Sequence, residues 1–254
     1  MRRLVPAFLF FFVAISALAQ QQYELVLIPV GAYNVPGAFG SLWQTELTGF
    51  NEGESFVPVK SDLIAICVIP EGCPDPAKPH QVFVWFVGDP QGQFIYVGRD
   101  HADDVQFHLR VFDSAHPNLS FGTMLPIARE RDFSATPVYF FDVVVDPRSR
   151  TLLRIYGFDN VSDDVTVNVT RTSEPRVGRA VSVRMPLHEK THSNGTAFPS
   201  FGSIDLASVL PPDILVPGVG PPRFLVQVQP NAQKLWGSVT ITNNETQHVT
   251  AIAP

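Results

Sequence analysis

The chain has 254 residues, of which 45% are hydrophobic and only 17% are charged, so its composition excludes an intrinsically disordered protein. Its 23 Pro, 17 Gly and 20 Phe predict many short segments separated by turns and exclude a helical bundle. The formal net charge of −6 gives no electrostatic attraction to nucleic acid or to an anionic membrane, so neither is expected as a partner.

Residues 1–19 have the pattern of a signal peptide. Arg2 and Arg3 precede an apolar run over residues 4–18, and Ala17 and Ala19 occupy the positions that signal peptidase reads. The run is shorter than the roughly 20 residues that a membrane-spanning helix needs. We therefore expect cleavage before Gln20, no membrane span in the mature chain, and a secreted, periplasmic or cell-surface location.

Alternation of apolar and polar residues is the dominant signal in the mature chain. In residues 105–111, Val105, Phe107, Leu109 and Val111 alternate with Gln106, His108 and Arg110, which is typical of a half-buried antiparallel strand. The strands expected in chain order cover residues 24–30, 42–50, 63–69, 82–87, 94–97, 105–111, 138–145, 151–156, 165–169, 181–185, 224–228, 236–242 and 248–252. Pro and Gly residues separate these strands, and residues 210–222 are predicted to form an extended connection.

This pattern predicts an all-β protein built from antiparallel β-sandwiches. Weak internal echoes favour two immunoglobulin-like modules, over residues 20–131 and 132–254. For example, Asp103-Asp104-Val105 and Asp163-Asp164-Val165 each follow a Gly-x-Asp turn, and each begins an alternating strand. One large β-sandwich is the alternative.

The mature chain contains only two cysteines, Cys67 and Cys73, separated by five residues. In an oxidising compartment, such a pair is expected to form a disulfide that stabilises a turn. Because the closed loop is small, loop-closure entropy predicts a contribution of only about 2 kcal/mol.

Segments at both ends of the mature chain resemble a known family. They are Ile28-Pro29-Val30, then Pro36-Gly37-Ala38-Phe39-Gly40-Ser41-Leu42-Trp43-Gln44-Thr45-Glu46-Leu47 with Asn51, and, near the C-terminus, Val239-Thr240-Ile241-Thr242-Asn243-Asn244-Glu245-Thr246-Gln247-His248-Val249-Thr250. They look like those of secreted, immunoglobulin-like β-sandwich proteins from environmental bacteria. The resemblance implies the fold and export; it implies no activity and no catalytic residue.

The sharpest chemical motif is His188-Glu189-Lys190-Thr191-His192. In zinc peptidases, two histidines at i and i+4 on one helix face bind Zn²⁺, and the glutamate activates the bound water. The sequence context disfavours a site with His188 and His192 as ligands and Glu189 as the catalytic base. The motif follows an alternating strand and Pro186, and Ser193-Asn194-Gly195 would end a helix after about two turns. An exposed polar loop is the favoured interpretation.

Two acidic turns contain carboxylates that could bind Ca²⁺. Ca²⁺ takes six to eight oxygen ligands from flexible loops. The candidate ligands are Asp100, Asp103, Asp104, Asp159, Asp163 and Asp164. Because Asp is also a favoured turn residue and neither spacing fits an EF-hand loop, plain turns are the favoured interpretation. No cofactor is therefore expected.

Aromatic residues near the N-terminal glycines, Tyr33 and Phe39, are candidates for stacking on sugar rings. Trp43, Trp85 and Trp236 lie within apolar strands, so we expect them to pack in the core.

The sequence therefore favours an exported, non-catalytic β-sandwich protein that acts in extracellular binding, in adhesion or as a structural component. Its expected partner is an extracellular or cell-surface protein or a glycan. A zinc-dependent hydrolase and a carbohydrate-binding module are the alternatives.

Overall fold

A computed structural model describes residues 22–61, 65–67, 76–118, 122–190 and 198–254. The chain is all-β, as its alternating pattern predicted, and its strands form antiparallel sheets stacked face to face. The signal peptide predicted for residues 1–19 lies outside the described residues. Among those described, no helix is both long enough and apolar enough to cross a membrane.

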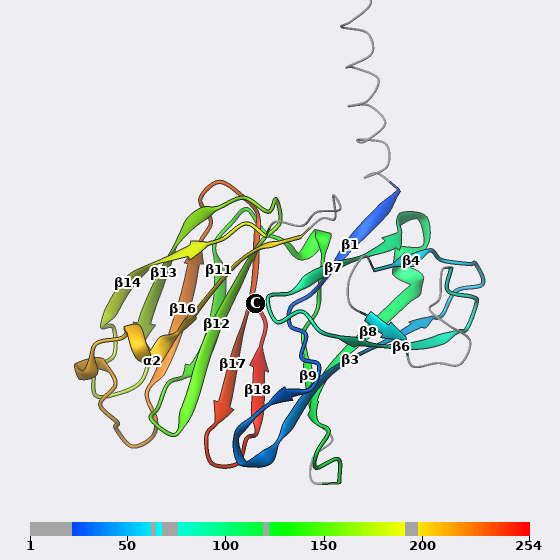
Figure 1. Cartoon of the computed structure of the whole chain (residues 1–254). Helices are drawn as coiled ribbons and strands as arrows, with labels where there is room; N and C mark the ends of the chain where they lie inside the picture. The colour runs from blue at the N-terminus through cyan, green and yellow to red at the C-terminus, as the bar shows by residue number, and fades with distance from the viewer. Residues whose placement is uncertain (1–21, 62–64, 68–75, 119–121, 191–197) are drawn as a thin grey trace, which may run out of the picture.

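The first half of the chain forms two sheets, on the right in Figure 1. Sheet I has the strand order β5-β6-β3-β8-β9, with β2 paired to β3, and sheet II has the order β10-β1-β7-β4. The bounds are β1 (Tyr23–Ile28), β2 (Val35–Pro36), β3 (Leu42–Asn51), β4 (Val59–Lys60), β5 (Ala65–Cys67), β6 (Val82–Val87), β7 (Gln93–Gly98), β8 (Val105–Asp113), β9 (Thr123–Leu125) and β10 (Ala128–Arg129). Short 3-10 turns are η1 (Ala38–Gly40), η2 (Arg99–Asp104) and η3 (Glu130–Asp132).

The second half forms the two sheets on the left in Figure 1. Sheet III has the order β15-β12-β17-β18, and sheet IV has the order β11-β16-β13-β14. The bounds are β11 (Val138–Val144), β12 (Ser149–Gly157), β13 (Asp163–Arg171), β14 (Ala180–Leu187), β15 (Ser200–Asp205), β16 (Arg223–Gln229), β17 (Leu235–Asn243) and β18 (Val249–Ile252). A single helical turn, α2 (Leu206–Val209), and the 3-10 turn η4 (Pro212–Ile214) connect β15 to β16.

Three apolar layers join the four sheets. Sheets I and II enclose one cluster, which includes Ile28, Leu47 and Phe83. Sheets III and IV enclose another, which includes Ile155 and Val167. In the third layer, Leu27 and Phe94 of sheet II pack with Tyr156 and Trp236 of sheet III, in one cluster with Ala128 and Phe133. Burial of both faces explains why β1 is apolar at consecutive positions.

The named strands pair only within their own half of the chain, and the change falls between Arg129 and Val138. An isolated bridge between Ser134 and Leu235 follows this point. The division into two immunoglobulin-like modules stays a prediction, because the third apolar layer also ties the halves together.

Several expected strands differ from those observed. The strand expected over residues 63–69 appears as β5 (Ala65–Cys67), with residues 62–64 and 68–75 outside the described part. Strand β14 continues through Pro186, which lies in an edge strand where a missing backbone N–H is tolerated. The alternating pattern did not reveal β15, because Gly202 and Ser203 interrupt its apolar residues.

Candidate functional site

The histidine motif begins in extended backbone, not in a helix. His188 directly follows β14 and forms a two-way bridge with Phe201, with N···O distances of 2.9 and 3.0 Å. The backbone N–H of Lys190 donates to the side-chain oxygen of Asn160 at 2.8 Å. A zinc peptidase motif needs both histidines on one helix face, so the described part of this motif lacks the required geometry. His192 lies outside the described residues.

A cavity of about 440 Å³ lies beside this segment, lined by Gln91, Pro186, His188, Glu189, Lys190, Phe201, Gly202 and Ser203. The ammonium group of Lys190 does not face a free ligand, because it forms an ion pair with Asp89 and lies 4.7 Å from the ring centroid of Phe198. In the part of the chain that the structure describes, no cluster of three or more His, Cys, Asp or Glu side chains could hold a metal ion.

In the first acidic turn, the carboxylate of Asp103 is paired with an arginine. Asp103 forms an ion pair with Arg131, and the hydrogen bond from that guanidinium lowers the pKa of Asp103 below its ordinary value. Asp104 lies 3.1 Å from Nδ1 of His101. Asp100 belongs to the same 3-10 turn, η2. Cationic and imidazole partners therefore lie where a calcium site would need additional oxygen ligands.

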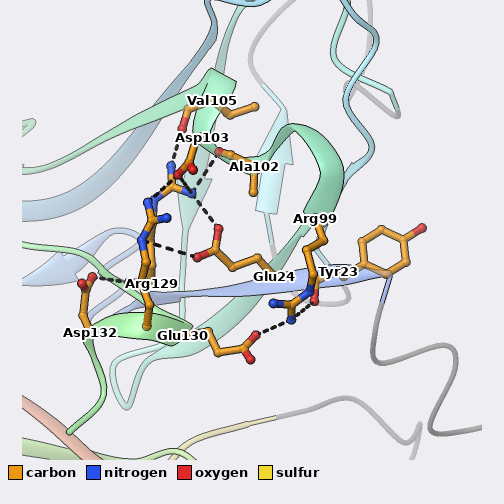
Figure 2. A network of polar contacts seen from close by, with 10 residues as sticks. Tyr23, Glu24, Arg99, Ala102, Asp103, Val105, Arg129, Glu130 and Asp132 are labelled. Carbon is orange, nitrogen blue, oxygen red and sulfur yellow. Dashed lines mark hydrogen bonds and ion pairs between the residues drawn. The ribbon is translucent and has the colours of Figure 1, made fainter.

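Arg129 is the centre of the polar network around this turn, shown in Figure 2. Its Nη1 donates to Glu24 at 2.7 Å and to the carbonyl of Ala102 at 2.9 Å, and its Nη2 donates to the carbonyl of Val105 at 2.6 Å. These bonds tie η2 to β1 and β10. The network is structural, and sequence reasoning missed it because its members are far apart in the chain.

In the second acidic turn, the carboxylates of Asp163 and Asp164 likewise contact protein groups. Burial raises the pKa of Asp163, but hydrogen bonds from the Asn231 side chain and from the backbone N–H groups of Ala232 and Asp164 bring it below its ordinary value. Asp164 forms an ion pair with Arg184 at 3.6 Å. Asp159 lies in the turn after β12 and is exposed. Protein groups thus bind the carboxylates of Asp163 and Asp164, and the interpretation of both acidic segments as plain turns stays a prediction.

The predicted disulfide stays a prediction. Cys67 ends β5, where only its backbone is described, and Cys73 lies outside the described residues.

The aromatic residues separate into buried and exposed groups. Trp85 and Trp236 are buried, as expected, but Trp43 is only partly buried, because β2 and the edge segment around Gly37 cover one side of its indole. Tyr33 and Phe39 are exposed, and the ring of Tyr33 packs against Phe86 with centroids 6.2 Å apart.

A different exposed surface combines aromatic rings with amides. On the outer face of sheet IV, the strand registers place four side chains in one row, one from each strand: Tyr139, Gln227, Asn168 and Ser182. Hydrogen bonds connect them in sequence, from Ser182 Oγ to Asn168 Oδ1 at 2.6 Å, from Asn168 Nδ2 to Gln227 Oε1 at 3.4 Å, and from Gln227 Nε2 to the Tyr139 hydroxyl at 2.9 Å. Together with Phe141, these residues form what we call the aromatic–amide face.

Phe141 extends this face at the edge of the sheet. It is 68% exposed, and its ring is nearly parallel to that of Tyr139, with an interplanar angle of 17° and centroids 6.3 Å apart. A bulge between Phe140 and Val143 shifts the register of β11, and Asp142 there has a φ of 57°. The bulge bends the edge strand beside Phe141.

A groove of about 550 Å³ begins at Phe141 and continues toward the β18 edge of sheet III. Its lining includes Phe141, Asp142, Val144, Ser149, Ile241, Asn243, His248, Thr250 and Ile252. The aromatic–amide face and this groove meet at Phe141, and the groove adds aliphatic side chains, hydrogen-bonding groups and the carboxylate of Asp142, which is paired with Arg223.

Sequence reasoning missed this surface, although one signal was present. The alternation over residues 165–169 identified Asn168 as outward-facing, and Tyr139 and Phe141 are two residues apart on one strand. What was missing was the register that places them beside Gln227. Comparison of the chain with family models, with curated proteins and with solved structures gives no match, so the resemblance to secreted immunoglobulin-like proteins stays an expectation.

Proposed function

We propose that the protein is an exported, non-catalytic binding protein that attaches to extracellular or cell-surface material through the aromatic–amide face. The observation that supports this proposal is the exposure of two parallel aromatic rings beside an ordered row of hydrogen-bonding side chains. Exposed aromatic groups next to oriented polar groups are characteristic of binding surfaces. The signal-peptide pattern of residues 1–19 supports export.

The face is well suited to binding because its geometry exists before a ligand arrives. Side chains that are already connected by hydrogen bonds lose little conformational entropy when a ligand binds. Since sheet IV is the outermost layer of the stack, its outer face is open to solvent at Phe141, Ser182 and Thr166.

Fractionation and binding test the proposal together. We expect the protein from its native source to begin near Gln20 and to occur outside the cytoplasm. Purified mature protein should sediment with cell-surface and matrix material from that source, and the double substitution Tyr139→Ala, Phe141→Ala should abolish this. Phe56→Ala is the matched control, because Phe56 is 59% exposed but lies in the first half of the chain. A protein that stays in the cytoplasm, or matrix binding unaffected by the double substitution, would contradict the proposal.

The zinc-hydrolase alternative has its own test. Metal analysis of the purified mature protein should find less than one equivalent of zinc, because His188 is held in an extended bridge. One tightly held zinc ion that is lost in both His188→Ala and His192→Ala would instead favour the hydrolase.

A further inference from the structure

The hydrogen-bonding row of the aromatic–amide face retains capacity for a ligand. An amide nitrogen carries two protons, so Asn168 and Gln227 each keep one after donating along the row. The Tyr139 hydroxyl accepts from Gln227, which leaves its own proton free to donate outward. The row thus presents several uncharged donors and acceptors, which are oriented by the hydrogen bonds among them.

Charged side chains at the margin of the face are already neutralised. Arg223 forms an ion pair with Asp142 beside Phe141, and Arg184 forms one with Asp164 beside Ser182. An anionic or cationic ligand would therefore gain little Coulomb energy here. An uncharged ligand with many hydroxyls does not depend on Coulomb attraction, so the pairing of these charges does not weaken its binding.

The aromatic rings require a ligand that also has apolar surface. The electron-rich faces of Tyr139 and Phe141 attract weakly positive C–H groups. A pyranose sugar meets both demands, because its ring has C–H groups on its faces and hydroxyls around its rim.

The length of the row indicates a chain of sugars. Four adjacent strands contribute one residue each, so three strand spacings give a length of about 14 Å. The groove beyond Phe141 adds Asn243, His248 and Thr250, which extends the surface further.

From these observations we infer that the aromatic–amide face binds an extended, neutral polysaccharide. The C–H faces of its sugars lie on Tyr139 and Phe141, and its hydroxyls bond to Gln227, Asn168 and Ser182. This inference rests on the proposed function, since it names the ligand class of the same face.

Affinity electrophoresis tests the inference with defined probes. Mature protein is run in native gels that contain hydroxyethyl cellulose, xyloglucan or galactomannan, with polygalacturonate as the charged comparison. We expect at least one neutral polymer to retard the protein. Phe141→Ala, which removes a ring, and Gln227→Leu, which removes the amide at similar size, should each weaken binding by about tenfold.

Two sets of variants separate the roles of ring and hydroxyl. Tyr139→Phe keeps the ring and should weaken binding less than Tyr139→Ala, which removes it. Phe56→Ala and Phe39→Ala remove exposed rings elsewhere and should leave retardation unchanged. Thermal melting of every variant checks that each is folded.

The inference is overturned if no neutral polymer retards the wild-type protein, if only polygalacturonate does, or if Phe141→Ala is retarded like the wild type. Periodate oxidation and protease digestion of the matrix material distinguish failure of the polysaccharide inference from failure of the proposed function. Binding through the face that survives periodate oxidation of glycans but not protease digestion would leave the proposed function standing and refute the polysaccharide. Absence of any matrix binding would refute the proposed function itself.

Discussion

Arg171 shows how a single residue organises a part of the chain that looked irregular in the sequence. It is fully buried at the end of β13, and its guanidinium donates to the carbonyl oxygens of Ser173, Glu174 and Ile214 at 2.6 to 2.8 Å. These bonds fasten the loop after β13 to η4, within the proline-rich connection. Backbone carbonyls shielded from water need a donor, and the Arg171 guanidinium supplies one to each of these three, including the carbonyl of the buried Ile214.

Removing this guanidinium should therefore be costly. We expect Arg171→Met to lower the free energy of unfolding by about 3 kcal/mol, because three carbonyl oxygens, among them that of the buried Ile214, lose a charged donor. Urea denaturation measures the effect. Arg176→Met is the control, since Arg176 is exposed and should change stability by less than about 0.5 kcal/mol. Equal effects of the two substitutions would contradict this role.

Tyr156 joins the two halves of the molecule through its hydroxyl, which donates to the carbonyl of Pro29. Burial raises the pKa of Tyr156 well above its ordinary value. The folded state thus keeps a proton that the unfolded state loses above about pH 10, so the stability from the neutral phenol is complete below that pH and declines as the pH rises.

This coupling predicts a pH-dependent difference between the wild type and Tyr156→Phe. At pH 7 the substitution should cost about 1 to 2 kcal/mol, because the Pro29 carbonyl loses its donor. The difference should shrink as the pH rises above about 10, since only the wild type loses stability by ionising this group. Denaturant titrations at several pH values measure it. A difference that stays constant up to the most alkaline pH would argue against a buried phenol.

At the scale of the strand, β3 depends on a glycine. Gly49 lies opposite Phe83 on β6, and a β-carbon at Gly49 would lie 2.0 Å from the Cζ atom of that ring. The glycine lets the phenylalanine ring cover the backbone of the neighbouring strand, which is a known use of glycine inside a sheet.

We accordingly expect Gly49→Ala to destabilise the protein by about 2 kcal/mol, because the new methyl group displaces a fully buried ring. Gly220→Ala is the matched control, since no atom lies within 4 Å of its β-carbon position. Chemical denaturation of both variants compares them. A Gly49→Ala protein as stable as the control would mean that Phe83 moves at little cost.

The cysteine pair belongs to the same scale, since β5 ends at Cys67. We expect thiol titration of unfolded, unreduced protein to find no free thiol, and Cys67→Ser to lower stability by about 2 kcal/mol. The same titration after reduction should find two thiols, which serves as the control. Two free thiols before reduction would refute the disulfide.

For the molecule as a whole, Lys190 connects the halves in a different way from the apolar third layer. Its ammonium group pairs with Asp89 in the turn between β6 and β7, and the two side chains are only 14% and 12% exposed. Lys190, which lies between the candidate zinc ligands in the sequence, therefore makes an ion pair between the first and second halves.

Lys190→Met should lower the free energy of unfolding by about 2 kcal/mol, because it leaves the shielded carboxylate of Asp89 unpaired. A double-mutant cycle with Asp89→Asn should show coupling of about 1 to 2 kcal/mol. The exposed pair of Arg150 and Asp205, 3.9 Å apart, serves as the control, and Arg150→Met should cost less than about 0.5 kcal/mol. Strictly additive effects of Lys190→Met and Asp89→Asn would contradict the contact.

The sequence predicted most of the fold from local patterns. Side chains alternate between the faces of a strand, so Val165, Val167 and Val169 could be assigned to a core and Asn168 to the surface without any structure. Position within an apolar strand correctly predicted burial of Trp85 and Trp236, but not of Trp43, which is only partly buried. These local patterns gave no indication of which outward faces meet, and so they did not foresee the layer formed by Phe94 and Tyr156.

The candidate site depended almost entirely on information that is not local. Alternation is a property of consecutive residues, and the amino-acid sequence by itself determined the β class, most of the long strands and their inner faces; it did not determine β15 or the short strands β2, β4, β9 and β10. Only the tertiary structure decided that Tyr139, Gln227, Asn168 and Ser182 form one row, because neighbours across a sheet are set by the pairing register of strands that are distant in the chain. The same holds for Lys190 and Asp89, which are 101 residues apart and meet only when the four sheets stack.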